Sequence, residues 1–432
     1  MTSDGYMLIL QAGAVEFFRL LSEVKGEIML LSKQKLQAND GIAWSAEFNP
    51  DGICLASTGQ DKKIRVWKET NGSFSPVFVS NDSDFGHTRT VRRLSWRPDS
   101  ELLAAVSFDS TCSLWRKTPN GELSFITKLS GQENEVKGVS FSPCGEMLAT
   151  CSRDKSIWIF DVSSLLERRA SGSSEFQKVV AGDHTNQEGD FVMPSSPSVL
   201  RERVRAEDIE CLAVLEGHSQ DVKAVKFSPH DSHMLVSVSY DDSVKIWRST
   251  TSDDWELSET LRGHSGTVWD VAFNPTNPDE FATVSADGSM KIWSRRPAPP
   301  RIKASDTYLL TGPLGVTSRR HRQETAFSAV SETWSCQTVQ VTTSQVENFP
   351  PQPVYSIDWT EQGFIALGCG DNTVRIYYRR DASILPVSTV ITASEPTSVS
   401  FNPRVPTELA VALEDGSLNI YELKGVEDYL CS

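Results

Sequence analysis

An aspartate followed six residues later by an aromatic side chain recurs seven times in this chain of 432 residues. Each copy joins a polar turn to an alternating apolar run. The copies are DKKIRVW (61–67), DSTCSLW (109–115), DKSIWIF (154–160), DDSVKIW (241–247), DGSMKIW (287–293), DNTVRIY (371–377) and DGSLNIY (415–421). A turn followed by alternating apolar residues is typical of a β-strand. Seven copies at one spacing therefore predict a repeat architecture built from strands.

The sequence between the copies supplies further strands. A Gly-His or Gly-Gln dipeptide precedes four copies, with its second residue at His87, Gln132, His218 and His264. An apolar run, a turn such as FSPCG (141–145) and a second run rich in small and β-branched residues follow the dipeptide. This order predicts a four-stranded antiparallel meander, or blade, in each repeat.

These phrases resemble the WD-repeat family over residues 41–421, apart from two insertions. The resemblance implies an all-β fold, a seven-bladed β-propeller in which radial repetition leaves few exposed sheet edges. After Tyr421 the sequence has too few residues for a turn and a complete outer strand. We expect EIMLLSKQKL (27–36) to supply this strand, so that an N-terminal strand closes the ring.

The domain boundaries follow from the repeats. We expect residues 27–432 to form the propeller and residues 1–26 to form a flexible N-terminal extension. Insertions interrupt the repeats at about 161–208 and 297–332; the first is rich in Ser and charged residues, and the second is basic and rich in Pro. Such compositions bury too little apolar surface to fold alone, so both are predicted to be mobile surface loops.

The composition narrows the class of protein. A formal net charge of -15 argues against a protein that coats nucleic acid, because phosphate binding requires an excess of Lys and Arg. Glu16 and Arg19 interrupt the apolar stretch at 7–21, which has no basic leader, so we expect neither a signal peptide nor a membrane span. The eight cysteines include no C-x-x-C pair, which favours a reducing compartment.

The repeated His and Asp residues invite a catalytic interpretation, but repetition favours a structural one. An active site is needed once, whereas a stabilising network is needed in every blade. We predict that a strand hydroxyl such as Ser237 joins each network. The predicted networks comprise His87, Asp109 and Trp115; His218, Asp241 and Trp247; and His264, Asp287 and Trp293. The first, sixth and seventh repeats keep the Asp but lack the Gly-His, which predicts incomplete networks there.

Motifs that would indicate chemistry are absent from the sequence. It contains no G-x-x-x-x-G-K-[ST], no G-x-S-x-G and no H-E-x-x-H, and its His and Cys residues lack the spacing of a zinc or cluster site. We therefore expect no catalytic residue, no cofactor and no metal site.

A meander places the Gly-His loop and the turn that carries the Asp at the same face of the ring. Residues beside them should point out of that face. Just after the leading apolar position of the first strand stand Trp44, Arg92, Lys137, Lys223, Trp269, Tyr355 and Thr397. Just before the Asp stand Gln60, Phe108, Arg153, Tyr240, Ala286, Gly370 and Glu414.

Cations and aromatic residues gather at these positions in the second to fourth repeats. Arg between aromatic residues is a composition found in binding hot spots, and a guanidinium can bind a carboxylate in a bidentate manner. We predict a partner-binding site made of Arg153, Phe108, Tyr240, Arg92, Lys137 and Lys223, with Trp269, Trp44 and Tyr355 beside them. The acidic neighbours Glu133, Glu135 and Asp221 compete for the same cations.

Other phrases of the sequence are more specific than the repeat. They are ENEVKGVSFSPCGEMLATCSRDKSIWIF (133–160), HSQDVKAVKFSP (218–229), SVSYDDSVKIW (237–247), DDWELSETLRGHSGTVWDVAF (253–273) and GCGDNTVRIY (368–377). These segments closely resemble the WD-repeat subunit of the cytosolic iron-sulfur protein assembly targeting complex.

The resemblance implies a non-catalytic scaffold within a hetero-oligomeric complex. Its implied partners are a small acidic subunit, a HEAT-repeat subunit, an adaptor and the apoproteins that receive iron-sulfur clusters, with neither nucleic acid nor membrane among them. It also implies a functional surface residue at Arg153 and a cytoplasmic location, with the nucleus as a second one. We expect the patch around Arg153 to bind an acidic or aromatic-carboxylate tail of a client or adaptor.

One phrase departs from this family. Some members end a strand of the fourth blade with Leu-Tyr-Arg, a tripeptide proposed to recruit a cluster-transfer co-chaperone, whereas this chain has Ile246, Trp247 and Arg248. The sequence therefore does not predict whether this chain makes that contact.

Two other functions fit the same scaffold. A substrate receptor or adaptor of a ubiquitin ligase, chromatin or signalling complex would use the same rim for unrelated peptides. An enzyme would need acids with shifted pKa values in the central channel. The proteins that co-purify from a cell extract distinguish the iron-sulfur assembly scaffold from the adaptor, and turnover of a substrate would indicate the enzyme.

Overall fold

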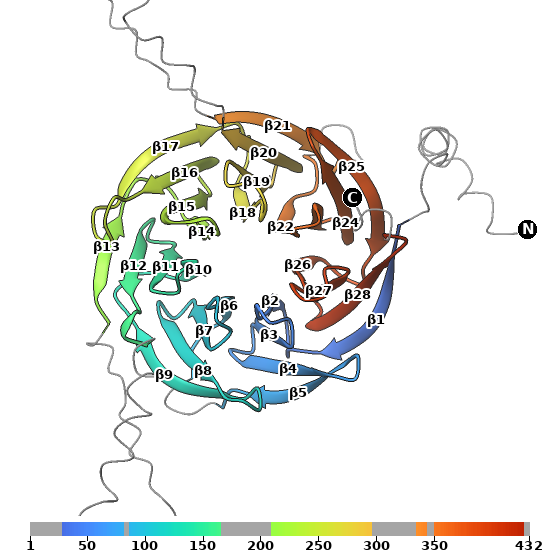
Figure 1. Ribbon diagram of the computed structural model, residues 1–432, viewed down its shortest axis with the longest axis horizontal. Helices are drawn as coiled ribbons and strands as arrows, with labels where there is room; N and C mark the ends of the chain where they lie inside the picture. Colours follow the sequence, from blue (N-terminus) through green and yellow to red (C-terminus); the bar gives the residue numbers. More distant parts are fainter. Residues whose placement is uncertain (1–27, 82–85, 166–208, 296–333, 344–349, 427–432) are drawn as a thin grey trace, which may run out of the picture.

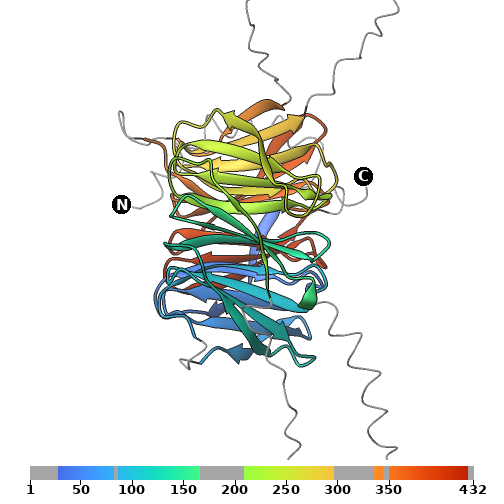
Figure 2. The ribbon, with the colours of Figure 1, turned by 90° about the vertical axis from the view of Figure 1, so that its left-hand side faces the viewer.

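A computed structural model describes residues 28–81, 86–165, 209–295, 334–343 and 350–426. These residues form seven four-stranded antiparallel sheets that are arranged radially around one axis (Figure 1). Seen from the side, the ring is a thick disc, and the strands run across it from one face to the other (Figure 2). The predicted seven-bladed β-propeller is therefore confirmed.

Each blade, numbered in sequence order, runs from an inner strand at the axis to an outer strand at the rim. The inner strands are β2 (Ala43–Phe48), β6 (Val91–Trp96), β10 (Val136–Phe141), β14 (Val222–Ser228), β18 (Val268–Phe273), β22 (Val354–Trp359) and β26 (Pro396–Phe401). The second strands are β3 (Cys54–Gly59), β7 (Leu102–Ser107), β11 (Met147–Ser152), β15 (Asp231–Ser239), β19 (Glu280–Ser285), β23 (Phe364–Cys369) and β27 (Glu408–Leu413).

The repeated Asp precedes the third strand of each blade. The third strands are β4 (Ile64–Thr70), β8 (Cys112–Lys117), β12 (Ile157–Asp161), β16 (Ser243–Arg248), β20 (Ser289–Arg295), β24 (Thr373–Arg380) and β28 (Ser417–Lys424). The outer strands are β5 (Ser73–Val79), β9 (Leu123–Leu129), β13 (Cys211–Leu215), β17 (Glu256–Arg262), β21 (Trp334–Gln340), β25 (Ser383–Ile391) and β1 (Met29–Gln37).

The core lies between neighbouring blades. Every residue of β3, β7, β11, β19, β23 and β27 is buried, because each of these second strands is covered on both faces. Their small and β-branched residues let adjacent sheets approach closely. One cluster, for example, joins Leu102 and Val106 of the second blade to Phe141 and Leu148 of the third. The blades therefore depend on each other for their apolar contacts.

The N-terminal strand closes the ring, as predicted. β1 pairs antiparallel with β28, from Met29 opposite Lys424 to Gln37 opposite Ser417. Leu30 points into the core with Tyr421 and Leu423, whereas its neighbour Leu31 is 45% exposed. Strands from opposite ends of the sequence thus complete one sheet.

Three of the predicted segments fall on residues outside the described ranges. The extension at 1–26 lies wholly outside them, and the insertions at about 161–208 and 297–332 lie outside them apart from 161–165. Their boundaries and mobility stay predictions. Within the described ranges, no helix is both long enough and apolar enough to span a bilayer.

Removal of the buried side chain at the closure should loosen the ring. We expect Leu30→Ala to lower the free energy of unfolding by about 2–4 kcal/mol, because it leaves a cavity between β1 and the seventh blade. The matched control Leu31→Ala removes an exposed side chain from the same strand and should change it by less than about 0.5 kcal/mol. Thermal and denaturant unfolding measure both, and equal effects would show that β1 does not close the ring as described.

Candidate functional site

All seven inner strands share a backbone irregularity near one face of the ring. In the first blade, Ala43 and Ser45 pair with consecutive residues of β3, so Trp44 between them has no direct partner. The same register shift occurs in β6, β10, β14, β18, β22 and β26. Such a β-bulge redirects the extra side chain. The bulged residues are Trp44, Arg92, Lys137, Lys223, Trp269, Tyr355 and Thr397, and all of them line one axial cavity.

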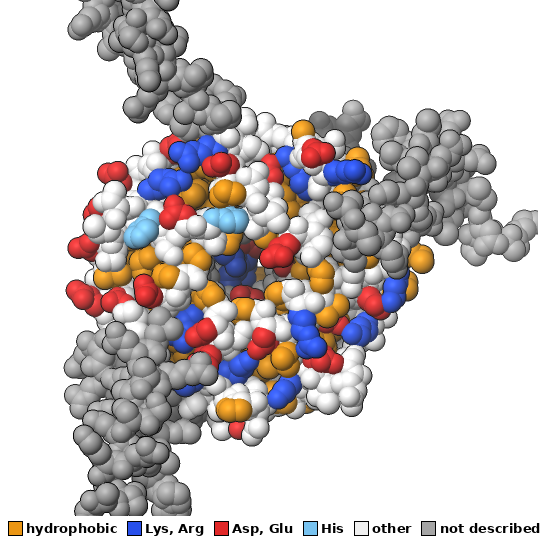
Figure 3. Space-filling model, in the orientation of Figure 1, with side chains coloured by type: hydrophobic (Ala, Val, Ile, Leu, Met, Phe, Trp, Pro, Cys, Tyr) orange, Lys and Arg blue, Asp and Glu red, His pale blue; other side chains and the backbone are white. Residues whose placement is uncertain are grey.

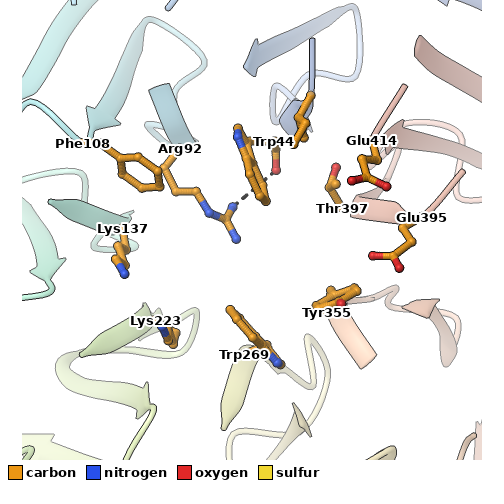
Figure 4. Close-up of a pocket in the computed structure, with 11 residues that line it drawn as sticks. Trp44, Arg92, Phe108, Lys137, Lys223, Trp269, Tyr355, Glu395, Thr397 and Glu414 are labelled. Carbon is orange, nitrogen blue, oxygen red and sulfur yellow. Dashed lines mark hydrogen bonds between the residues drawn. The ribbon is translucent and has the colours of Figure 1, made fainter. Parts of the chain in front are cut away.

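This axial pocket has a volume of about 340 Å³, within the range of ligand-binding sites. The other lining residues are Ile42, Phe108, Glu395 and Glu414. In Figure 4 the cations of blades two to four lie on one side and the carboxylates of blade seven on the other, with Trp44 and Trp269 between them. The structure thus brings together seven of the nine residues predicted to bind a partner, whereas Arg153 and Tyr240 lie outside this lining.

Glu395, in the loop before β26, lines the pocket but is not among the residues predicted from the sequence. A signal was available, because Glu395 precedes the bulged Thr397 by two positions, as Ile42 precedes the bulged Trp44. Thr397 and Glu414 stood at the predicted rim positions but were not assigned to the site. An alignment of the repeats extended by two residues would have included the acidic side of the pocket.

Arg92 lies on the basic side of the pocket, against Trp44. Its guanidinium packs over the Trp44 ring at 4.8 Å and donates a hydrogen bond of 3.4 Å to the Trp44 carbonyl oxygen. Burial and repulsion from Arg93 lower the pKa of Arg92 to about 10, so the group stays charged at neutral pH. No carboxylate of the described residues lies within 4 Å of it to form an ion pair.

Two lysines extend the basic side. Lys137 and Lys223 share the carboxylate of Asp221, at 2.8 and 3.4 Å. The Lys223 ammonium also lies over the rings of Tyr240 and Trp269, at 5.1 and 5.0 Å, so Tyr240 contacts the pocket through this lysine. Burial and repulsion from Lys137 lower the pKa of Lys223 to about 8, although Asp221 opposes the shift.

Arg153 lies at the edge of the same charge network. Its side chain is 54% exposed, and its guanidinium is 3.7 Å from Glu135. Arg89 and Lys137 approach the same carboxylate, at 2.8 and 3.8 Å. Glu135 and Asp221 therefore do pair with the predicted binding cations, as expected. These two carboxylates are shared among four cations, Arg89, Lys137, Arg153 and Lys223. The network keeps a positive excess beside the pocket, and Arg153 can act on the pocket through Glu135.

The opposite side of the pocket is acidic. Glu395 and Glu414 are joined through the backbone, where the N–H of Glu414 donates to the carbonyl of Glu395 at 3.0 Å. Burial and the charge of Glu414 raise the pKa of Glu395. Burial and both carboxylates raise the pKa of Tyr355 to about 12. Among the described residues, neither carboxylate has a cation within 4 Å.

The predicted His and Asp residues form hydrogen-bonded networks inside their blades. His218 Nδ1 lies 2.9 Å from Asp241, and its Nε2 lies 2.8 Å from the Ser237 hydroxyl, which accepts the Trp247 indole N–H at 2.8 Å. The fifth blade repeats this arrangement with His264, Asp287, Thr283 and Trp293. The second blade uses His87, Asp109 and Trp115 with the hydroxyl of Ser113.

In the network of the fourth blade, the histidine ring is neutral and the carboxylate is ionised. Burial lowers the pKa of His218, so at neutral pH its uncharged ring donates from Nδ1 and accepts at Nε2. Burial of Asp241 favours its neutral form, but hydrogen bonds from His218 and Ser243 outweigh this and hold its pKa below the ordinary range. These groups satisfy each other within the blade, which leaves the axial side chains free for binding.

Blades without a histidine satisfy the Asp carboxylate through other groups. In the first blade Asn39 takes the place of the histidine, since its amide donates to Asp61 at 2.8 Å, and Arg65 donates to the same carboxylate at 2.6 Å. An amide therefore replaces the imidazole beside the Asp in this blade, and the prediction that the network as a whole is incomplete stays a prediction. In the sixth blade Arg375 bonds to Asp371.

The fourth-blade phrase that departs from Leu-Tyr-Arg lies on β16. Trp247 is buried in the blade network, whereas Arg248 is partly exposed and approaches Asp231 at 3.3 Å.

A second cavity lies at the other end of the axis. The blades run clockwise in Figure 1 and the opposite way in Figure 4, so the two views show opposite faces, and Figure 3 shows the second face with its axial hollow. This cavity of about 310 Å³ includes Glu47, Arg93, Lys226, Asp270 and Asp358 in its lining. Arg93 of the second blade pairs with Asp270 of the fifth at 2.7 Å, across the axis.

Acids with shifted pKa values, the requirement stated for an enzyme, do occur in this channel. Burial is the main cause of both shifts: it raises the pKa of Glu47, and it raises the pKa of Asp358 to about 6. The carboxylate of Asp358 accepts hydrogen bonds from the backbone N–H groups of Phe401 and Trp359. These bonds give the buried carboxylate a structural role. Within the described ranges, no three His, Cys, Asp or Glu side chains are grouped so that they could hold a metal ion.

Comparison with known proteins agrees with this architecture. The family described as "WD domain, G-beta repeat" matches residues 31–68, 80–116, 123–161, 209–248 and 255–294, which run from β1 to β20. The "Probable cytosolic iron-sulfur protein assembly protein 1" of Vanderwaltozyma polyspora is 30% identical over 234 residues, which cover 46% of this chain and 67% of that protein. The chain belongs to this family of WD-repeat proteins.

Other members of the family match over shorter stretches. The proteins of the same name from Candida glabrata and Kluyveromyces lactis are 41% and 40% identical over 138 and 141 residues. These matches cover 30% and 31% of this chain, and they span 40% and 41% of the length of the two relatives. The comparisons therefore establish the type of repeat and the relatives of this chain. Its activity and partners are the subject of a proposal.

Deletion of the shared hydroxyl in a blade network should destabilise the propeller. Ser237→Ala removes the acceptor of the Trp247 indole and the partner of His218, and both groups stay buried without a replacement. We expect the free energy of unfolding to fall by about 2–4 kcal/mol. Ser258→Ala, at an exposed position of β17, serves as the control in the same melts and should have almost no effect. Equal melting curves for the two variants would contradict the structural role.

Asp358 should make stability depend on pH. Its pKa is about 6 in the folded protein, above the value of 3.8 for an ordinary aspartate, so the folded state binds this proton more tightly than the unfolded state. Stability from this group therefore rises as pH falls through about 6. Between pH 7 and pH 5 the protein should gain about 1 kcal/mol relative to Asp358→Asn. Denaturant unfolding at both pH values measures the difference, and the same pH slope in both proteins would refute it.

Proposed function

We propose that this chain is a non-catalytic scaffold subunit of the cytosolic iron-sulfur protein assembly machinery, and that its axial pocket binds the tail of a client or adaptor protein. The observation that carries the proposal is the convergence of seven bulged side chains, one from each blade, on a single cavity. Four aromatic residues and three cations line it, a composition suited to protein recognition.

The shape of the cavity favours a chain end. The Arg93–Asp270 ion pair crosses the axis from blade two to blade five, and the residues next to it, Arg92 and Trp269, line the pocket. A peptide can therefore enter from one face but meets this pair at the floor. Arg92 offers its charge to a carboxylate, and the rings of Trp44 and Trp269 offer contact to an aromatic side chain.

The relatives supply the biological setting. Their printed names describe cytosolic iron-sulfur protein assembly, and we extend that setting to this chain, with a cytoplasmic location and the nucleus as a second one. A small acidic subunit, a HEAT-repeat subunit, an adaptor and apo iron-sulfur proteins are the proposed partners. The cluster is the cargo of such a complex, and the chain supplies the surface on which donors and clients meet.

A pull-down from cell extract tests the setting. Recovery of iron-sulfur assembly subunits supports the proposal. Recovery of ubiquitin-ligase or chromatin subunits in their place would favour the alternative adaptor function and contradict it.

Variants of the basic side test the pocket. We expect Arg92→Ala to weaken binding of a client tail peptide by about tenfold or more, because it removes the unpaired guanidinium. Arg153→Glu should also weaken binding, by a smaller factor, because it puts a second negative charge beside Glu135 and draws Lys137 away from the ligand. Fluorescence anisotropy with labelled peptides measures both, and thermal melts should stay nearly unchanged.

A matched control removes a cation elsewhere. Arg404 is exposed in the turn between β26 and β27, on the opposite face, and Arg404→Ala should leave peptide binding unchanged. Loss of binding in all three variants would indicate a non-specific charge effect. Unchanged binding in Arg92→Ala would overturn the pocket as the tail-binding site.

A further inference from the structure

The two sides of the axial pocket carry opposite charges that do not neutralise each other. Arg92 on the basic side has no carboxylate partner among the described residues, and Glu395 and Glu414 on the acidic side have no cation within 4 Å among them. Figure 4 shows these groups on opposite sides of the opening, with Trp44 and Trp269 between them. Charges held apart in this way by a rigid scaffold are available to a ligand.

The acidic side is a built feature of the fold. Glu395 enters the pocket from the loop before β26, and Glu414 enters it from the turn after β27. The hydrogen bond from the N–H of Glu414 to the carbonyl of Glu395, at 3.0 Å, fixes the two loops together. Burial and the charge of Glu414 raise the pKa of Glu395, which also accepts a hydrogen bond from the Tyr355 hydroxyl, so the two neighbouring carboxylates repel each other. A positive group placed between them would relieve this repulsion.

The basic side cannot supply that positive group. Lys137 and Lys223 are held by Asp221, and Lys223 is also held between two aromatic rings. Arg92 is held against Trp44 by ring contact and by its hydrogen bond to the backbone. Each cation is thus fixed on its own side, and the missing charge has to come from outside the chain.

We propose that the axial pocket recognises a dipolar peptide end, with its terminal carboxylate at Arg92 and a basic side chain of the same peptide at Glu395 and Glu414. This inference rests on the proposed tail-binding function and adds a second point of recognition to it. The carboxylate orients the peptide, the aromatic residues contact its apolar part, and the acidic pair selects among tails. A tail that lacks the basic group binds through the carboxylate and the rings alone.

Matched peptides separate the two points of recognition. The probes are hexapeptides that end in phenylalanine with a free carboxylate and carry one lysine at the second, third or fourth position from the end. In the paired probe the same lysine is acetylated, which removes its charge and keeps most of its length. We expect the full-length protein to bind one of the lysine peptides about tenfold more tightly than its acetylated partner, in anisotropy at low salt.

Variants assign the preference to the acidic pair. The double variant Glu395→Gln with Glu414→Gln should lose the preference for lysine. It should bind the acetylated peptide with the same affinity as the unchanged protein. Glu361→Gln, an exposed position outside this pocket, is the matched control and should keep the preference. Melting curves of all variants check that the ring is intact.

The outcomes are distinguishable. If neither peptide binds the unchanged protein, tail binding at this pocket fails, and the inference fails with it. If both peptides bind equally well and Arg92→Ala weakens both, the tail-binding function stands and the dipolar recognition is overturned. A lysine preference that survives in the double variant would also overturn it, because the basic group would then bind elsewhere.

Discussion

Closure of the ring by β1 and β28 is the constraint on which the rest of the structure depends. A blade buries its second strand only between two neighbours, so an open ring would leave two sheets exposed. The axial pocket depends on the same closure, because each bulged side chain comes from a different blade. Loss of the pairing between residues 29–37 and 417–424 would separate Trp44 from Thr397, which belong to the two blades that meet there. Fold stability and site geometry are therefore coupled through one strand pair.

The bulge explains how one repeat can serve two purposes. In each inner strand the bulged residue lines the axial pocket, whereas its ladder-paired neighbours pack between blades or, as Arg93 and Asp270 do, meet across the axis. The blade requires the hydrogen-bonded Asp but places no demand on the bulged side chain, which is tryptophan, arginine, lysine, tyrosine or threonine in different blades. Sequence variation at this position changes what the pocket binds without changing the blade. This is why the pocket can be basic on one side and acidic on the other in a protein that is acidic overall.

Repetition made much of this structure predictable from the sequence. The seven Asp residues located the third strands, and the position after the leading apolar residue of each first strand located the bulged side chains, although the bulge itself was not foreseen. Features that join distant blades could not be predicted. The pairing of Arg93 with Asp270 spans 177 positions and depends on the diameter of the closed ring. For Arg153, the sequence predicts a position on the rim, but only the folded chain shows that Glu135 lies beside it and that Arg153 is not among the residues lining the cavity.

The ion pair across the axis also decides what kind of ligand the scaffold can accept. Arg92 and Arg93 are adjacent on β6, as Trp269 and Asp270 are on β18, yet the first member of each pair lines the pocket and the second crosses the axis. The bulge after the first residue of each strand produces this division. The propeller therefore presents a socket with a polar floor, and a chain that passed through the ring would have to break a buried ion pair, which is costly. A socket with charged groups on its sides suits the end of a peptide better than its middle, because only an end brings a terminal charge to the bottom.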